Sequence, residues 1–527
     1  MTRGPRHVVV GLALLAGIQL LVFPAGAQIP AAGLLSSHEM ELETNRPNLV
    51  GNSLDFFERR LPDGTIKRYA VAATHVNGFD ILDLSNPLNP TVVGRFVTPG
   101  SNYHPWVQVN GPRNIVALSI EDPAGATVSH TGSTGIEFVD ISDVTNPTRL
   151  GVVDGLVGPH TIRMIGPDHI YTSNPTFIID YSSFPIGAED VKQSAICGHE
   201  FSPDTNNPGR TYVGICGAVG KWGILDTTDP WNPVLLHQEF DNKLEYAHEV
   251  YPAPDSSFVA VADFRGGGQT WVKCPGGALH FYDISGKYKP GASLTNPEKM
   301  GVWHIPFTGT LPVDPSAQNA ALPNWGSCTL HSFQFQPERL LITAGLYSAG
   351  TWVMDPSGPT ATGGDYDEYP GSTTLPFGPT TWGNTKGNFL AEGDFVNASQ
   401  WLPFDVPPSK DHVYTNGLVR GLDVLHYHGT PPKKLSRLRI AASATGGVVG
   451  GILDRYAVLT YEGWVNKPLA GMTVEIRSGG TTVTATTGAD GSFSANLGLA
   501  AGSHQVTVTW VGNEDFEVSS LSRQVTV

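Results

Sequence analysis

The sequence predicts an all-β protein, and three observations carry this prediction. Gly and Pro are frequent, at 61 and 41 of 527 residues, whereas Asp, Glu, Lys and Arg together reach only 15%. This composition favours short strands joined by turns and argues against coiled coils and long exposed helices. Hydrophobic residues make up 40% of the chain, which is enough for a sizeable core. The third observation is a short phrase that recurs along most of the chain.

Residues 1–27 have the pattern of a secretory signal peptide. Arg3 and Arg6 form a basic start, residues 8–23 are largely apolar, and the small residues at 25–27 provide a cleavage site before Gln28. We therefore expect a secreted protein, extracellular or periplasmic, that is exported by the general secretory route.

The formal net charge of −16 becomes −18 without this segment, because the segment contains two Arg and no acidic residue. An acidic secreted protein is a poor candidate for binding nucleic acid or anionic membranes. No later stretch has the run of about 18 apolar residues that a membrane span requires, so no span is expected.

The recurring phrase is a buried strand that ends in Asp and is followed by a turn rich in Asn and Pro. The Asp carboxylate is expected to accept hydrogen bonds from backbone N–H groups of that turn, which is a local structural role. Seven copies occur, four of them clear and three weaker, at residues 78–90, 135–147, 223–233, 278–285, 177–180, 350–356 and 421–426.

A second motif, a His followed by apolar residues at alternate positions, falls between the copies. It occurs at His104, His160, His199, His248 and His331. The interval from the preceding strand-end Asp is 21, 20, 19 and 22 residues for the first four, and 48 for the fifth, where residues 286–326 contain an insertion. Such regular spacing indicates a repeated structural unit.

Each unit is predicted to hold four strands, beginning with the His motif and with the Asp-ended strand in third place. Seven such units predict a seven-bladed β-propeller. The first and seventh units start near Asn52 and Gln400, which keep the apolar alternation but lack the His. We therefore expect Asn52 and Gln400 to line the central channel beside the five histidines.

The repeated phrases, such as Phe-Val-Asp-Ile-Ser at residues 138–142, resemble the LVIVD-repeat family of secreted bacterial β-propellers. The resemblance covers roughly residues 45–440. It implies the propeller fold but no particular chemistry, because proteins of this type have no single known activity. The third and seventh units depart from the phrase, so their limits are the least well defined.

Residues 441–456 are predicted to be a linker, and residues 457–527 a small β-sandwich. Runs that alternate with period two in the latter, such as 472–477 and 504–510, are separated by Gly-rich turns. This segment resembles bacterial immunoglobulin-like and carboxypeptidase-regulatory-like domains, which implies a role in spacing or attachment.

Five histidines at one register would surround one end of the channel. Converging neutral imidazoles suit Zn, Fe, Cu or Ni, and the side of Asn52 and Gln400 would stay open for water or substrate. Two other interpretations remain. Each His could bond a carbonyl of the neighbouring blade and have only a structural role, with no cofactor, or the imidazoles could line a site for an organic molecule or a sugar.

Glu200 and Glu249 each follow a His directly. Regular strand alternation would send them to the opposite face, so they are predicted to pack between blades or to support the histidines rather than to bind a ligand. Scattered basic residues such as Arg163 could reach the channel but are expected to be solvated.

The four cysteines form an even set in an oxidising compartment, which predicts two disulfides. A turn near Asn206 would place Cys197 opposite Cys216 in an antiparallel strand pair. Cys274 and Cys328 would then join adjacent blades and hold the insertion between them.

Two classes of function remain. The first is a secreted binding or scaffolding protein with a His-lined channel, whose partner is an unidentified protein or extracellular polymer. The second is a metal-dependent extracellular enzyme, either an oxidoreductase or a lyase or hydrolase of an extracellular polymer. The lack of a nucleophile elbow, a zinc-protease helix motif and a phosphate-binding loop favours the first, and the histidine register favours the second. The sequence determines neither the substrate nor the oligomeric state.

Overall fold

The computed structural model of the chain describes residues 34–36, 39–74, 78–98, 106–120, 134–157, 159–216, 220–265, 276–305, 328–356, 385–391, 396–404, 411–418 and 420–527. These residues are almost entirely strands and turns, and their one helical segment is the short 3-10 helix η1 (Ala188–Asp190). The predicted all-β class is therefore confirmed. No helix within the described ranges has the length and hydropathy to cross a membrane. The predicted signal peptide, His104 and Cys274 lie outside the described residues.

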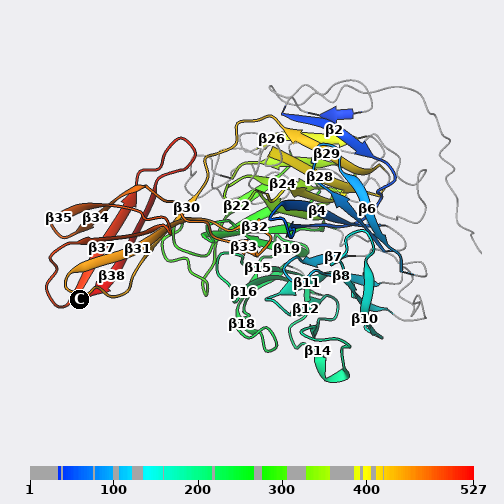
Figure 1. The fold of residues 1–527 in the computed structure, drawn as a ribbon, viewed down its shortest axis with the longest axis horizontal. Coiled ribbons are helices and arrows are strands. Elements are labelled where there is room, and N and C mark those ends of the chain that lie inside the picture. The colour runs from blue at the N-terminus through cyan, green and yellow to red at the C-terminus, as the bar shows by residue number, and fades with distance from the viewer. Residues whose placement is uncertain are drawn as a thin grey trace, which may run out of the picture.

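The strands up to residue 427 form seven antiparallel sheets of four or five strands (Figure 1). Five of these sheets each consist of four consecutive strands. These are β3 (Leu54–Arg60), β4 (Ile66–Ala73), β5 (Phe79–Asp83) and β6 (Thr91–Phe96); β7 (Val107–Asn110), β8 (Ile115–Ile120), β9 (Gly135–Asp140) and β10 (Thr148–Asp154); β11 (Ile162–Ile165), β12 (His169–Thr172), β13 (Phe177–Asp180) and β14 (Val191–Gln193); β15 (Gly198–Pro203), β16 (Arg210–Ile215), β17 (Lys221–Asp226) and β18 (Val234–Phe240); and β19 (Ala247–Pro252), β20 (Phe258–Asp263), β21 (Ala278–Asp283) and β22 (Glu298–His304).

The other two sheets each include a strand from the N-terminal end of the described chain. One consists of β23 (Ser332–Phe335), β24 (Ile342–Gly345), β25 (Thr351–Met354), β26 (Thr385–Ala391) and β1 (Leu34–Ser36), and the other of β27 (Val396–Trp401), β28 (His412–Gly417), β29 (Gly421–Tyr427) and β2 (Met40–Arg46). The sequence prediction began the repeat region at residue 45, which is too late, because β2 pairs along β29.

The first strand of each sheet contacts the first strand of the next, in the order β3, β7, β11, β15, β19, β23 and β27. Apolar clusters fill the spaces between neighbouring sheets. Phe79 of β5 packs with Val116 of β8, for example, in one such cluster. The ring closes where Leu54 and Phe56 of β3 pack with Tyr414 of β28. The sheets therefore surround a central channel lined by their first strands, as in a β-propeller.

The strand-end Asp residues have the local role that the repeated phrase predicts. In five copies the carboxylate accepts a hydrogen bond from the backbone N–H two residues later. The donors are Ser85 for Asp83 (2.7 Å), Ser142 for Asp140 (2.7 Å), Ser182 for Asp180 (2.8 Å), Thr228 for Asp226 (2.9 Å) and Ser285 for Asp283 (2.8 Å). These turns end the third strand of each sheet and start the reversal into the fourth.

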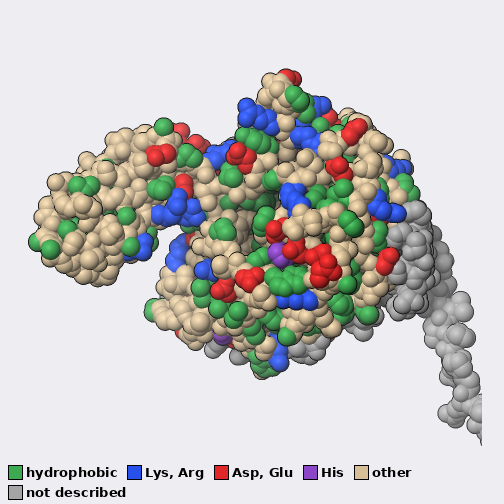
Figure 2. Space-filling model, turned by 60° about the horizontal axis from the view of Figure 1, so that its bottom comes forward, with side chains coloured by type: hydrophobic (Ala, Val, Ile, Leu, Met, Phe, Trp, Pro, Cys, Tyr) green, Lys and Arg blue, Asp and Glu red, His purple; other side chains and the backbone are tan. Residues whose placement is uncertain are grey.

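The C-terminal part contains two packed sheets and a short hairpin. The sheets consist of β30 (Ser436–Ile440), β31 (Val448–Arg455) and β36 (Ser492–Asn496), and of β35 (Thr481–Thr486), β34 (Thr473–Ser478), β37 (Ser503–Trp510) and β38 (Ser519–Thr526); the hairpin is β32 (Val458–Thr460) and β33 (Gly463–Val465). Leu438 and Val449 of one sheet share a core with Val474 and Val506 of the other. The surface of this part is mainly uncharged, whereas acidic and basic side chains are interspersed over the ring of sheets (Figure 2).

The prediction of a linker at residues 441–456 is wrong for its second half. Residues 448–455 form β31, which pairs with β30 on one side and with β36 on the other. Their glycines mimic a linker in composition, but Gly451 lies opposite Ile440 in the sheet, where an added Cβ would meet the Arg439 carbonyl oxygen at 2.2 Å. The two-sheet unit therefore begins at β30.

Buried polar contacts hold the C-terminal part against the ring of sheets. Glu338, which is only 3% exposed, accepts a hydrogen bond from Arg455 Nε at 2.5 Å and lies 3.4 Å from Lys434 Nζ. The Asn206 side chain accepts a hydrogen bond from the Ala457 N–H at 2.7 Å. Loss of a partner from such a buried ion pair leaves a charge without compensation.

We predict that Arg455→Met lowers the free energy of unfolding by about 3 kcal/mol, the low end of the range for a broken buried pair, because Lys434 still lies near Glu338. Urea denaturation measures the change. The matched control is Arg477→Met, since Arg477 forms an exposed pair with Glu475 and such pairs contribute less than about 1 kcal/mol. Equal losses in the two variants would show that the Glu338 contact does not stabilise the interface.

Candidate functional site

Four of the five predicted histidines lie together at the start of the first strands. His160 precedes β11, His199 and His248 lie in β15 and β19, and His331 precedes β23. Successive ring centroids are 5.6 Å apart for His160 and His199, 4.2 Å for His199 and His248, and 4.6 Å for His248 and His331. We call this set the imidazole arc.

Aromatic side chains enclose the imidazole arc. The Tyr246 ring packs edge-on against His199 at 5.2 Å, Phe264 against His248 at 4.7 Å, and Tyr347 stacks on His331 at 4.9 Å. His199 and His248 are 4% and 0% exposed. Burial holds the pKa of both imidazoles well below the ordinary value, and their neighbouring histidines add to the effect. Both rings are therefore neutral at physiological pH and carry a nitrogen lone pair.

Among the described residues, several nitrogens in the arc have no hydrogen-bond partner. These are Nδ1 of His199 and both ring nitrogens of His248. Other side chains make the bonds between neighbouring first strands: Ser53 accepts from the Val107 N–H at 2.9 Å, and Thr161 donates to the His199 carbonyl. The structural interpretation, in which each His bonds a neighbouring blade, therefore does not describe His248. Buried polar atoms without partners are costly, which points to a ligand.

Two β-bulges change the direction of the glutamates that follow the histidines. The pairing of β15 with β16 shifts by one residue between Gly198 and Phe201, and that of β19 with β20 shifts between Ala247 and Val250. Bulges re-aim side chains, and here regular alternation does not apply. The alternation argument used for the glutamates is therefore wrong, and their supporting role stays a prediction.

Glu200 of β15 and Glu249 of β19 both lie near Arg163 of β11. Arg163 Nη2 lies 3.4 Å from Glu249 Oε1 and 3.9 Å from Glu200 Oε2. Glu249 also accepts a hydrogen bond from the Phe333 N–H of β23 at 3.0 Å. Glu200 Oε1 lies 4.0 Å from His248 Nδ1, so this acidic layer lies directly against the imidazole arc.

The acidic layer also contains Asp55 of β3, which accepts hydrogen bonds from the Val109 and Phe56 N–H groups at 2.7 and 2.8 Å. Burial raises the pKa of Asp55 to about 6. Burial and the neighbouring Glu249 raise the pKa of Glu200 well above its ordinary value. The pKa of Glu249 is also raised by burial, although Arg163 opposes the shift. The expectation that Arg163 is solvated is wrong: it is the counter-charge of this buried layer.

A small enclosed cavity of about 20 Å³ adjoins the acidic layer, which is room for one water molecule. Gln400, Arg163, Glu249 and Tyr251 are among its lining residues. Gln400 is thus a neighbour of the acidic layer, and Asn52, just before β3, is 1% exposed; that both line the channel stays a prediction.

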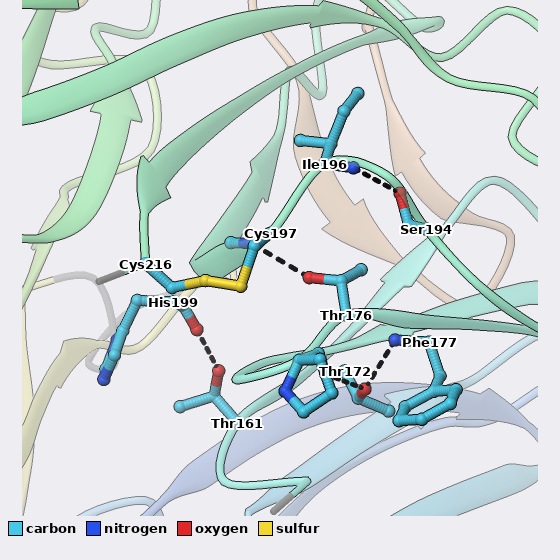
Figure 3. Close-up of a disulfide and its surroundings, with 11 residues drawn as sticks. Thr161, Thr172, Thr176, Phe177, Ser194, Ile196, Cys197, His199 and Cys216 are labelled. Atoms are coloured by element: carbon cyan, nitrogen blue, oxygen red, sulfur yellow. Dashed lines mark hydrogen bonds between the residues drawn. A yellow bond between two sulfur atoms is a disulfide. The ribbon is translucent and has the colours of Figure 1, made fainter. Parts of the chain in front are cut away.

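A disulfide anchors the strand that carries His199. Cys197 and Cys216 are bonded, as the sequence predicts, and join the start of β15 to the residue after β16 (Figure 3). The neighbouring sheet holds the same segment, because the Gly198 N–H donates to Thr176 Oγ1 at 2.9 Å. Cys328 is also disulfide-bonded. Its predicted partner, Cys274, lies outside the described residues, and that pairing stays a prediction.

Among the described residues, no three side chains of the imidazole arc have donor atoms that all lie within 4.8 Å of one another. Within the described ranges, one group of three His, Cys, Asp or Glu side chains has all its donor atoms within 4.8 Å of one another: Glu43, His412 and His426. That group lies outside the channel, on β2, β28 and β29, and no sequence motif indicated it. The prediction that three channel histidines meet one ion stays a prediction.

Comparison with known proteins supports a repeat fold. The LVIVD repeat model matches residues 68–98, which span the end of β4 through β6. No curated protein matches the sequence. Among solved structures, the chain is similar to the β-propeller domain of Cps50 (Swd1) from Myceliophteria thermophila, with 7% identity, a TM-score of 0.45, and coverage of 73% of this chain and 99% of that one. It is also similar to a functionally unknown protein from Desulfotomaculum acetoxidans, with 13% identity, a TM-score of 0.37, and coverage of 57% and 82%.

We predict that Arg163→Met destabilises the protein more at pH 8 than at pH 5. Without the guanidinium, the pKa of buried Glu249 rises further above its unfolded value. A carboxyl group with a raised folded pKa binds protons more tightly in the folded state, so its contribution to stability falls as pH rises. Urea denaturation at the two pH values measures the difference. As a control, Lys67→Met removes a more exposed pair with Asp83. A deficit that is equal at both pH values would contradict the assigned role of Arg163.

Proposed function

We propose that this chain is a secreted binding protein, in which a seven-bladed β-propeller presents a ligand site at one end of its channel. The seven sheets are the blades, residues 1–27 are the signal peptide, and the C-terminal sheets form an immunoglobulin-like spacer. The ring of sheets supports a binding role because it holds side chains from separate strands at fixed positions around one axis.

The observation that carries the proposal is the pair of partnerless imidazoles at the centre of the arc. His199 and His248 are neutral, buried and 4.2 Å apart between ring centroids, and three of their ring nitrogens have no hydrogen-bond partner in the described part of the chain. Such donors suit a transition-metal ion, Zn, Cu, Ni or Fe, which binds the neutral imidazole. His331 and His160, whose rings lie next to those of His248 and His199, are the candidates for a third ligand.

The acidic layer supports metal binding indirectly, through its contact with the histidines. Glu200, 4.0 Å from His248 Nδ1, can accept a hydrogen bond from the ring nitrogen that does not bind the ion. Carboxylates in this position fix the tautomer of metal-binding histidines and increase their basicity. An organic ligand with N–H or O–H donors would use the same imidazoles.

We predict that the purified full-length protein, prepared without chelators, contains one transition-metal ion at the channel. The double variant His199→Ala, His248→Ala should lose that ion and keep its fold, because apolar packing between the sheets does not depend on the imidazoles. Metal analysis by inductively coupled plasma mass spectrometry, with circular dichroism as the fold check, measures both effects.

The matched control is His237→Ala, which removes a histidine paired with Glu239 far from the first strands. It should retain the channel ion. Metal content that is unchanged in the double variant would contradict a channel metal and leave an organic ligand as the alternative.

A metal-dependent extracellular enzyme is the second candidate, and the acidic layer favours it. Glu200 and Glu249 could act as general bases beside a bound ion, since burial raises the pKa of both carboxyl groups. The discriminating variant is Glu200→Gln. Formation of new reducing ends from an extracellular polysaccharide, lost in Glu200→Gln while the metal is retained, would support the enzyme. An absence of turnover over a panel of polymers would favour the binding protein.

A further inference from the structure

The ring of sheets closes through a strand that comes from the opposite end of the repeat region. β2 pairs with β29, and no covalent bond between the described residues crosses this seam. At one end of the seam, Asn45 Nδ2 donates to the Arg420 carbonyl at 3.0 Å, across 375 residues of sequence, and to Asp423 at 2.7 Å. Figure 1 shows β2, in blue, beside β29, in yellow-orange.

The other end of the seam carries the three-donor group of the described residues: Glu43 on β2, His412 on β28 and His426 on β29. His426 Nδ1 lies 3.3 Å from Glu43 Oε1. The rings of His412 and His426 are stacked, with centroids 4.4 Å apart, because the two residues are directly paired across β28 and β29. Their donor atoms all lie within 4.8 Å of one another.

A β-bulge places the glutamate in this group. The pairing of β2 with β29 shifts between Leu42 and Thr44, so Glu43 is the additional residue on β2. A regular strand would alternate Glu43 with its neighbours, whereas the bulge lets it approach His426. Because of this extra residue, the group contains side chains from three strands instead of two.

The donor set and its surroundings fit a zinc ion. Two imidazoles and one carboxylate are a common protein ligand set for Zn²⁺, and tetrahedral coordination would hold the ligand atoms about 3.4 Å apart. The Glu43–His426 distance already has this value, and His412 needs only a small side-chain movement. His412 is 2% exposed, whereas the side chains of Glu43 and His426 are each 29% exposed, so an ion can enter from solvent.

The surroundings also suggest the fourth ligand. The His428 ring lies 4.0 Å from the His426 ring, and His428 Nε2 is 2.7 Å from Glu41 of β2. Either His428 or a water molecule could complete the coordination. No Lys or Arg forms an ion pair with Glu41 or Glu43 among the described contacts, so protein cations do not compete there with an added ion.

We propose that Glu43, His412 and His426 bind a divalent transition-metal ion, with Zn²⁺ as the best fit, and that this ion stabilises the closure of the ring. The site is separate from the channel and does not depend on the proposed channel metal. Because its ligands come from both ends of the repeat region, an ion there would bind the closed ring and not the open one. It would therefore stabilise the pairing of β2 with β29 by mass action.

The test uses full-length protein with the channel variant His199→Ala, His248→Ala as background, so that any remaining ion belongs to another site. After chelator treatment, we expect this protein to take up one equivalent of Zn²⁺ in equilibrium dialysis. Addition of Glu43→Gln should weaken that binding more than about 100-fold, which exceeds the typical effect of altering a residue behind the ligands. His426→Ala should have the same effect.

A second measurement reports on ring closure. Zn²⁺ should slow hydrogen–deuterium exchange of the β2 amides in the background protein and leave it unchanged after Glu43→Gln. Glu43→Gln preserves side-chain size at a partly exposed position, so it should fold even if His426→Ala does not. His237→Ala, which removes a His–Glu pair elsewhere, should still take up one equivalent of Zn²⁺. A background protein that takes up no Zn²⁺, or uptake that Glu43→Gln leaves unchanged, would overturn the proposal and leave Glu43 and His426 as a simple ion pair.

Discussion

The architecture depends on the pairing of β2 with β29. Among the described residues, most apolar clusters in the ring draw residues from two neighbouring sheets, so opening one joint would expose both of its faces to water. At the joint between β28 and β3, Tyr414 packs on Phe56 and connects the last sheet to the first. The fourth strand of the last sheet, β2, comes from the start of the repeat region. Because loop-closure entropy grows slowly with length, a long connection does not prevent this pairing.

The parts of the fold that the sequence predicts are those set by nearby residues. Each strand-end Asp and the N–H group that it binds are two residues apart, so the repeated phrase alone predicts the turn. His199 and His248 occupy equivalent positions because the four-stranded unit that contains them is repeated along the chain with a similar length. The Cys197–Cys216 bond likewise lies within one strand pair. The predicted features therefore lie within single units.

The features that the sequence does not predict need contacts between units or a change in strand geometry. Arg163 meets Glu249 only because the ring brings β11 and β19, the first strands of two sheets that are not consecutive, close to each other. β2 carries no copy of the repeated phrase, and its place beside β29 depends on ring closure. The β-bulge after Gly198 depends on how the backbones of β15 and β16 pair, which is a contact between two strands. Gly214 on β16 has no room for a side chain, because an added Cβ would meet the Ala247 carbonyl oxygen at 2.2 Å.

In both the channel and the seam, a β-bulge brings a glutamate to an imidazole. The charged groups around the glutamate differ between the two places. In the channel, Arg163 neutralises Glu249 and burial favours protonation of Glu200, so carboxylates there support histidines and the imidazoles remain the donors. At the seam, Glu43 is solvated and its close ionic partner is His426. A cation that binds between these two side chains gains a carboxylate and an imidazole together. For this reason, a divalent ion fits the seam with little rearrangement, whereas the channel must rotate a third histidine into place.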